Sequence, residues 1–169
     1  MKKSNIRLIT FSAVCTAAVF VLTAYLHIPS HTGFVHIGDG IIFLCAALLP
    51  LPYAIFVGSV GAGLADVLSG FAIFAPGTVV IKALSVVFFA RTKRIVSVRN
   101  IFALIPAYAL CIGGYYLYDA LIIGNFLSAL AGIPGYAMQC LLSTVLFIAL
   151  GLSFDKIGFK DKFLGDIKR

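Results

Sequence analysis

Three ionisable side chains, Asp39, Asp66 and Lys82, lie in apolar stretches of the chain that carry no other charged residue. At membrane depth a charged side chain costs about 3 kcal/mol or more, so it usually faces the protein interior, pairs with an opposite charge or contacts a polar solute. Two carboxylates and one ammonium in this setting therefore predict either an ion pair that joins helices or polar anchors for a bound solute.

The composition places these charges in a membrane protein. Hydrophobic residues make up 62% of the 169 positions and charged residues 11%, and the mean hydropathy is +1.10. A helix of about 20 apolar residues crosses a hydrocarbon core of about 30 Å. We predict an all-α membrane protein, a bundle of six transmembrane helices in one integral membrane domain over residues 1–169. The predicted helices cover roughly residues 7–26, 39–50, 53–68, 77–90, 101–123 and 136–154.

The distribution of basic residues predicts the orientation of this bundle. Every lysine and arginine except Lys82 falls at or before the start of the first predicted helix, between the fourth and fifth, or after the sixth. Cytoplasmic loops collect lysine and arginine, so both termini are predicted to be cytoplasmic in a multi-pass protein of a bacterial cell membrane. The net charge of +7 is then a topology signal and does not indicate a nucleic-acid partner.

This topology brings the isolated charges to a similar depth. Asp39 begins the second helix and Asp66 ends the third, both on the outer side, and Lys82 lies about 9 Å below the outer end of the fourth. Asp119 lies in the outer part of the fifth helix. Charges from four helices at one level predict a polar cavity open to the outside.

Neighbouring residues add candidate cavity walls. Tyr115 and Tyr116 precede Asp119 at four- and three-residue spacing, which places them on its helical face, and Gln139 lies in the outer third of the sixth helix. His36 follows a loop that is either a lid over the cavity or an ordinary solvated loop. The predicted substrate-binding residues are His36, Asp39, Lys82, Tyr115, Tyr116, Asp119 and Gln139, with Asp66 either among them or in a structural ion pair with Lys82.

Each of these predictions has a structural alternative. Asp39 could simply stabilise a helix N-terminus. The tyrosines could form an interfacial aromatic belt, and Gln139 an ordinary interhelical contact. His27 and His31 have the spacing of a helical metal pair, but Pro29 between them disfavours a helix, so we predict no metal and no cofactor.

Small residues predict close helix contacts. Glycines within residues 58–65 lack the lysine and the strand of a phosphate-binding loop, and they suit close packing of a membrane helix instead. Ala13 and Ala17 lie on one face of the first helix and form a candidate docking surface for another membrane helix. The four cysteines all fall in predicted helices without metal-type spacing and are interpreted as packing residues.

Three ordered motifs carry a family resemblance: GFVHIGD at residues 33–39, GAGLADVLSG at 61–70 and APGTVVIK at 75–82. With the helix number and the length, they resemble the substrate-binding S component of energy-coupling-factor (ECF) vitamin transporters over nearly the whole chain. The resemblance implies a vitamin-binding subunit that is not an enzyme. It also implies partners, a membrane coupling protein and two cytoplasmic ATPases, and it matches Ala13-x-x-x-Ala17 to the motif that docks on the coupling protein.

The sequence says less about the identity of the ligand than about the family. The chain has no tryptophan and no glutamate, so tyrosine and phenylalanine would stack on a ligand while Asp39, Lys82 or Asp119 anchored its polar groups. This favours hydroxymethylpyrimidine or a vitamin B6 form, with riboflavin, thiazole, pantothenate and folate as further possibilities. The alternative function is a stand-alone secondary transporter coupled to protons through the buried carboxylates.

Overall fold

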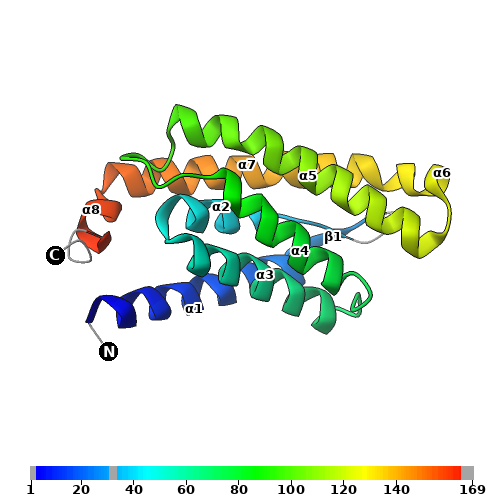
Figure 1. The fold of residues 1–169 in the computed structure, drawn as a ribbon, viewed down its shortest axis with the longest axis horizontal. Helices are drawn as coiled ribbons and strands as arrows, with labels where there is room; N and C mark the ends of the chain where they lie inside the picture. Colours follow the sequence, from blue (N-terminus) through cyan, green and yellow to red (C-terminus); the bar gives the residue numbers. More distant parts are fainter. Residues whose placement is uncertain (1–2, 31–33, 165–169) are drawn as a thin grey trace.

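The fold is a bundle of helices with one small β-hairpin, and the computed structural model describes residues 3–30 and 34–164 (Figure 1). His31 therefore lies outside the described residues. The first half of the chain contains α1 Lys3–Ala24, the hairpin strands β1 His27–Pro29 and β2 Phe34–His36, α2 Asp39–Leu48 and α3 Leu51–Leu68. The second half contains α4 Ala75–Ser85 with the 3₁₀ turn η1 Val86–Phe88, α5 Val98–Ile123, α6 Phe126–Ala129, η2 Leu130–Gly132, α7 Ile133–Lys156 and α8 Phe159–Leu164.

Each of the six predicted helices has a counterpart: α1, α2, α3, α4 with η1, α5 and α7. The ends differ by a few residues, and the hairpin, α6 and α8 were not predicted. Proline and glycine set several ends. Pro76 lies in the first turn of α4, and Gly124, with φ of 70°, ends α5 in the left-handed region.

Four helical segments within the described residues are long and apolar enough to cross a membrane: Ile6–Ala24, Leu51–Leu68, Val98–Ile123 and Phe126–Lys156. The helices Asp39–Leu48 and Ala75–Phe88 are apolar but shorter. Ten residues of α2 extend only about 15 Å, half of a hydrocarbon core. Six complete spans therefore stay a prediction.

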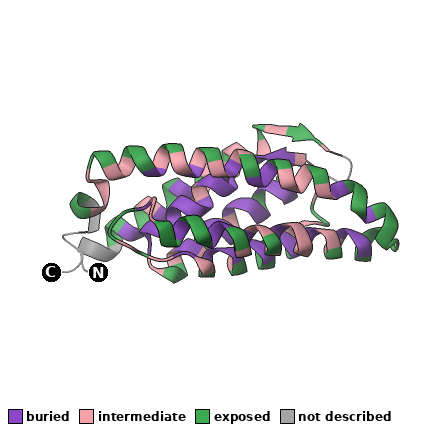
Figure 2. Ribbon diagram, turned by 90° about the horizontal axis from the view of Figure 1, so that it is seen from above, coloured by how far each residue is buried: buried purple, intermediate pink, exposed green. Residues whose placement is uncertain are grey.

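The short helix α2 lies at the centre of the bundle. All of its residues except Ile41 are buried, and Phe43 stacks on Phe89 with ring centroids 4.9 Å apart. Phe89 in turn contacts Phe147 of α7 edge to face. Buried residues concentrate on the inward faces of the helices while large apolar side chains remain exposed on their outer faces, which suits contact with lipid (Figure 2).

The ends of the bundle differ in charge. The start of α1, the connection between η1 and α5, and α8 lie at one end of the molecule, whereas α6 lies at the other (Figure 1). The clusters of lysine and arginine in the described residues belong to the first of these ends. That this end is cytoplasmic stays a prediction from the distribution of basic residues.

Helices α1 and α3 approach closely at Gly61. A β-carbon at this position would lie 2.9 Å from Cβ of Val19 and 3.0 Å from the carbonyl oxygen of Thr16, both on α1. The small-residue packing expected for residues 58–65 is therefore confirmed at Gly61, where only glycine fits without a shift of α1.

Replacing Gly61 tests this contact. We expect Gly61→Ala to destabilise the protein by about 1–3 kcal/mol, because the methyl group would clash with the side chain of Val19 and crowd the carbonyl oxygen of Thr16 on α1. Gly113→Ala is the matched control, since a β-carbon at Gly113 has no atom within 4 Å and alanine favours the helix. Thermal unfolding in detergent should separate the two variants, and equal stability would show that α1 and α3 do not depend on this glycine.

Candidate functional site

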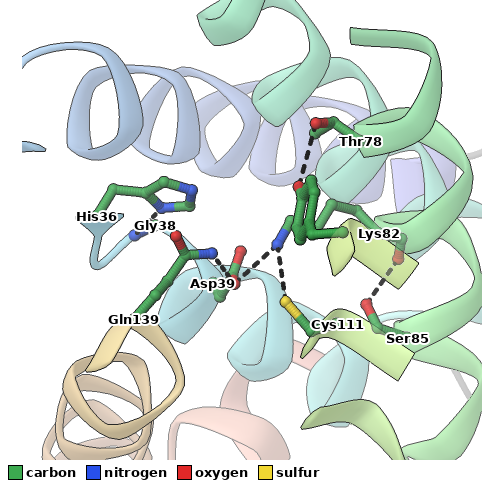
Figure 3. Close-up of polar contacts among 9 residues, drawn as sticks. His36, Gly38, Asp39, Thr78, Lys82, Ser85, Cys111 and Gln139 are labelled. Atoms are coloured by element: carbon green, nitrogen blue, oxygen red, sulfur yellow. Dashed lines mark hydrogen bonds and ion pairs between the residues drawn. The ribbon is translucent and has the colours of Figure 1, made fainter. Parts of the chain in front are cut away.

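A buried ion pair joins α2 to α4. Nζ of Lys82 lies 2.8 Å from Oδ2 of Asp39, and each side chain is only 2% exposed. The ammonium also lies 3.7 Å from Sγ of Cys111 and 5.0 Å from the ring centroid of Tyr115, both on α5. The Lys82 cation thus has a carboxylate, a thiol and an aromatic face around it, and none of its charge is left exposed (Figure 3).

Gln139 extends this pair to a third helix. Its Nε2 donates a hydrogen bond of 2.9 Å to the same oxygen, Oδ2 of Asp39. The first turn of α2, the last turn of α4 and the first third of α7 therefore meet at one carboxylate oxygen (Figure 3). Because a buried carboxylate is stable only when paired and hydrogen-bonded, these contacts fix how the three helices pack together.

His36 continues the polar network at the end of the hairpin. Its Nδ1 accepts a hydrogen bond of 3.2 Å from the backbone nitrogen of Gly38. Burial lowers the pKa of His36 to about 4, although the negative charge of Asp39 opposes this shift. The ring is therefore neutral at physiological pH, and Nε2 carries its one proton.

A small cavity of about 40 Å³ lies next to this network. Its walls come from the hairpin, the end of α3, the connection to α4, and helices α4, α5 and α7. The lining residues are Phe34, His36, Asp66, Phe71, Phe74, Thr78, Tyr115, Tyr136 and Gln139. Five of these are aromatic, and Tyr115 and Tyr136 stack with centroids 5.2 Å apart. The cavity combines flat apolar surfaces with a few polar groups, which is typical of a site for a small organic ligand.

The cavity contains four of the residues that the sequence placed at a binding site: His36, Asp66, Tyr115 and Gln139. Asp39 and Lys82 do not line it and lie behind Gln139 and Tyr115. The interpretation of Asp39 as a simple helix cap does not fit, because its carboxylate pairs with Lys82 and no side chain caps α2.

Of the two alternatives left open for Asp66, the ion pair with Lys82 is not formed, since Lys82 pairs with Asp39. The reason is the depth of α4 relative to α3. The carboxylate of Asp66, on α3, lies beside the hydroxyl of Thr78, and Thr78 precedes Lys82 by one turn of α4. A turn of about 5.4 Å places Lys82 at the level of Asp39 instead.

The predicted shared face of Tyr115, Tyr116 and Asp119 is also only partly correct. Tyr115 lines the cavity, whereas Tyr116 is half-buried against Phe126 and does not. Asp119 is buried and accepts a hydrogen bond from the hydroxyl of Tyr136, so it holds a cavity wall in place without being part of it. Adjacent residues on a helix point about 100° apart, so Tyr115 and Tyr116 cannot both face one small cavity.

Sequence reasoning did not assign five lining residues, Phe34, Phe71, Phe74, Thr78 and Tyr136. The sequence does contain features that point to three of these residues. Phe71 and Phe74 are the aromatic residues of an outer connection that contains no lysine or arginine, and Thr78 precedes Lys82 by one turn. Across residues 3–30 and 34–164, no group of three or more histidine, cysteine or acidic side chains is arranged to hold a metal ion.

Apolar helices around a polar, aromatic cavity define a polytopic membrane protein of the solute-binding kind. Over residues 3–156 the chain matches the family model described as "ECF-type riboflavin transporter, S component", and it belongs to this family. It is thus a multi-pass cell-membrane protein and the substrate-binding subunit of an ECF importer, not itself an enzyme. A comparison with curated proteins gave no significant match.

The ion pair can be tested by a double-mutant cycle. We expect Asp39→Asn and Lys82→Met each to destabilise the protein by about 3–5 kcal/mol, because each leaves one buried charge without its partner. The double variant should lose less than the sum of the two, with a coupling of at least about 1 kcal/mol. Unfolding in mixed detergent micelles measures these values.

The matched control uses the same substitutions at exposed positions of α8. Asp161→Asn and Lys162→Met should each change stability by less than about 0.5 kcal/mol. Strict additivity of the Asp39 and Lys82 substitutions would contradict the pairing.

Proposed function

We propose that this S component captures a small water-soluble vitamin or vitamin precursor with an aromatic ring from outside the cell, and holds it in the cavity between the hairpin and α3, α4, α5 and α7. The observation that carries this proposal is the convergence of five aromatic side chains with Asp66, His36, Thr78 and Gln139 on one cavity. Stacking rings favour a flat ligand, and the few polar groups fix its orientation.

Two ligand classes have support. The family description names riboflavin, and the aromatic walls would suit its ring system. Hydroxymethylpyrimidine or a vitamin B6 form is favoured by the small cavity and by the buried carboxylate of Asp66. Thiazole, pantothenate and folate have no specific observation in their favour.

Binding would require the hairpin to move. A cavity of about 40 Å³ has room for only a few water molecules, and either vitamin is larger than that. Phe34 and His36 line the cavity from β2, and Phe34 contacts Phe71 edge to face with centroids 5.0 Å apart. Separation of these two rings would open the cavity on the side of the hairpin, which then acts as the lid.

The remaining parts of the proposal concern topology and partners. The chain would cross the membrane six times with cytoplasmic termini and dock through α1 on the membrane coupling protein, and two cytoplasmic ATPases would supply the energy. Ala13 and Ala17 are exposed on α1, as a docking surface requires. A stand-alone proton-coupled carrier has only the buried carboxylates in its favour.

Ligand binding to the purified protein tests the site. We expect wild-type protein in detergent to bind riboflavin, hydroxymethylpyrimidine or a B6 form with one molecule per chain, and Tyr115→Ala to weaken binding at least about tenfold, or 1.4 kcal/mol. Isothermal titration gives both quantities. Tyr116→Ala is the matched control, because this neighbouring tyrosine does not line the cavity. Equal loss of affinity in both variants would argue against the site.

Docking is tested separately from binding. We expect the double variant Ala13→Leu/Ala17→Leu to lose at least nine tenths of vitamin uptake in cells that contain the coupling module, because bulky side chains prevent close helix approach. Its ligand affinity should remain unchanged. Ala109→Leu, at an exposed alanine of α5, serves as the control and should transport normally. Loss of ligand binding in the double variant would place α1 in the site instead.

A further inference from the structure

The polar groups of the cavity differ in what they can still offer to a ligand. Asp66 is 6% exposed and lines the cavity from the last turn of α3. Among the described residues, its Oδ2 is buried and has no hydrogen-bond partner. A buried carboxylate oxygen without a donor costs free energy, so this atom favours a ligand that supplies one.

Gln139 offers a second acceptor. Its Nε2 donates to Asp39, so the amide orientation is fixed and Oε1 is the atom left for other partners. The ion pair of Asp39 and Lys82 therefore determines which end of the Gln139 amide is available. Replacing the pair would free the amide to rotate and would remove this selectivity.

The donors around the cavity are already engaged. The hydroxyl of Tyr115 donates to Oγ1 of Thr78 over 3.1 Å, and the hydroxyl of Tyr136 donates to Asp119. The ammonium of Lys82 faces Asp39, Cys111 and the Tyr115 ring. The hydroxyl of Thr78 accepts from Tyr115 and lies beside the Asp66 carboxylate. Among the described lining residues, Nε2 of His36 is a further neutral donor, because its Nδ1 accepts from Gly38.

We propose that the cavity selects a heteroaromatic ligand that carries an amino group. The Asp66 carboxylate would accept a hydrogen bond from this amino group, and Oε1 of Gln139 would accept a second hydrogen bond from the ligand. This inference rests on the proposed function and specifies the ligand class. A hydrogen bond to a charged partner contributes about 1.5–3 kcal/mol to binding. An analogue that lacks the donor binds more weakly, because it leaves the buried acceptor unpaired. The carboxylate also repels phosphorylated or carboxylated ligands.

Two matched ligand pairs test the selectivity. Pyridoxamine and pyridoxine differ by an aminomethyl in place of a hydroxymethyl group, and 4-amino-5-hydroxymethyl-2-methylpyrimidine is compared with its 4-hydroxy analogue. We expect wild-type protein in detergent to bind the amino member of at least one pair ten or more times more tightly than its partner, and more tightly than riboflavin. Isothermal titration measures all five ligands.

Variants of Asp66 assign the preference to its carboxylate. Asp66→Asn should weaken binding of the amino ligand at least tenfold while changing binding of its partner less than threefold. Asp66→Glu should keep the preference because it keeps the charge. Asp161→Asn, at an exposed carboxylate of α8, should change nothing. Gel filtration and thermal unfolding establish that each variant is folded.

The outcomes separate this inference from the proposed function. Tight binding of riboflavin over both amino ligands, equal binding within both pairs, or an amino preference that survives in Asp66→Asn would overturn the inference and leave a vitamin-binding subunit. Absence of binding for every vitamin tested would overturn both. If Asp66→Asn does not fold, loss of the preference in Asp66→Glu would overturn the inference.

Discussion

The Asp39–Lys82 ion pair is the interaction on which the rest of the site depends. Two opposite charges are fully buried in an apolar bundle, where neither is tolerated alone. The pair sets the depth of α4 relative to α2, and the hydrogen bond from Gln139 adds α7 to the same point. The contact of Lys82 with the ring of Tyr115 then fixes this residue of α5 as a wall of the cavity. Residues that do not line the cavity therefore position those that do.

The same constraint gives the cavity its chemical character. Because Lys82 is neutralised by Asp39, the walls present no free cation from the described residues, and Asp66 remains as the charged group at the cavity. Aromatic rings from four different parts of the chain surround it: the hairpin, the connection between α3 and α4, α5 and α7. A ligand that stacks on these rings has few directions in which to place its donors, and the most favourable one is toward Asp66.

Much of the architecture was predictable from hydropathy alone. Long apolar runs give the positions of the helices because each must satisfy its backbone internally and bury or expose its side chains in a membrane. The convergence of charges at one level was also expected from the topology, and four of the residues expected near it, His36, Asp66, Tyr115 and Gln139, line the cavity. Their role in binding a ligand stays a prediction. The partner of Lys82 was missed because one helical turn separates the two possible carboxylates, which is within the error of helix ends taken from hydropathy.

Other features depend on tertiary contacts that no local pattern encodes. The hairpin pairs His27 with His36, and each of its strands has only three residues, which is too short to give a periodic signal. Tyr115 and Tyr116 are adjacent tyrosines, so the sequence does not distinguish them. They differ in the direction in which their side chains point from α5. Phe71 and Phe74 lie in a connection whose path is set by the helices on either side.

A structure of the protein with its bound vitamin would test the central relationship between the ion pair and the cavity most directly. We expect the ligand ring against Tyr115 and Tyr136, an amino group on Asp66, and Lys82 still paired with Asp39. A ligand held by Lys82, with Asp39 released from the pair, or a ligand bound outside the space between the hairpin and α3, α4, α5 and α7 would contradict it.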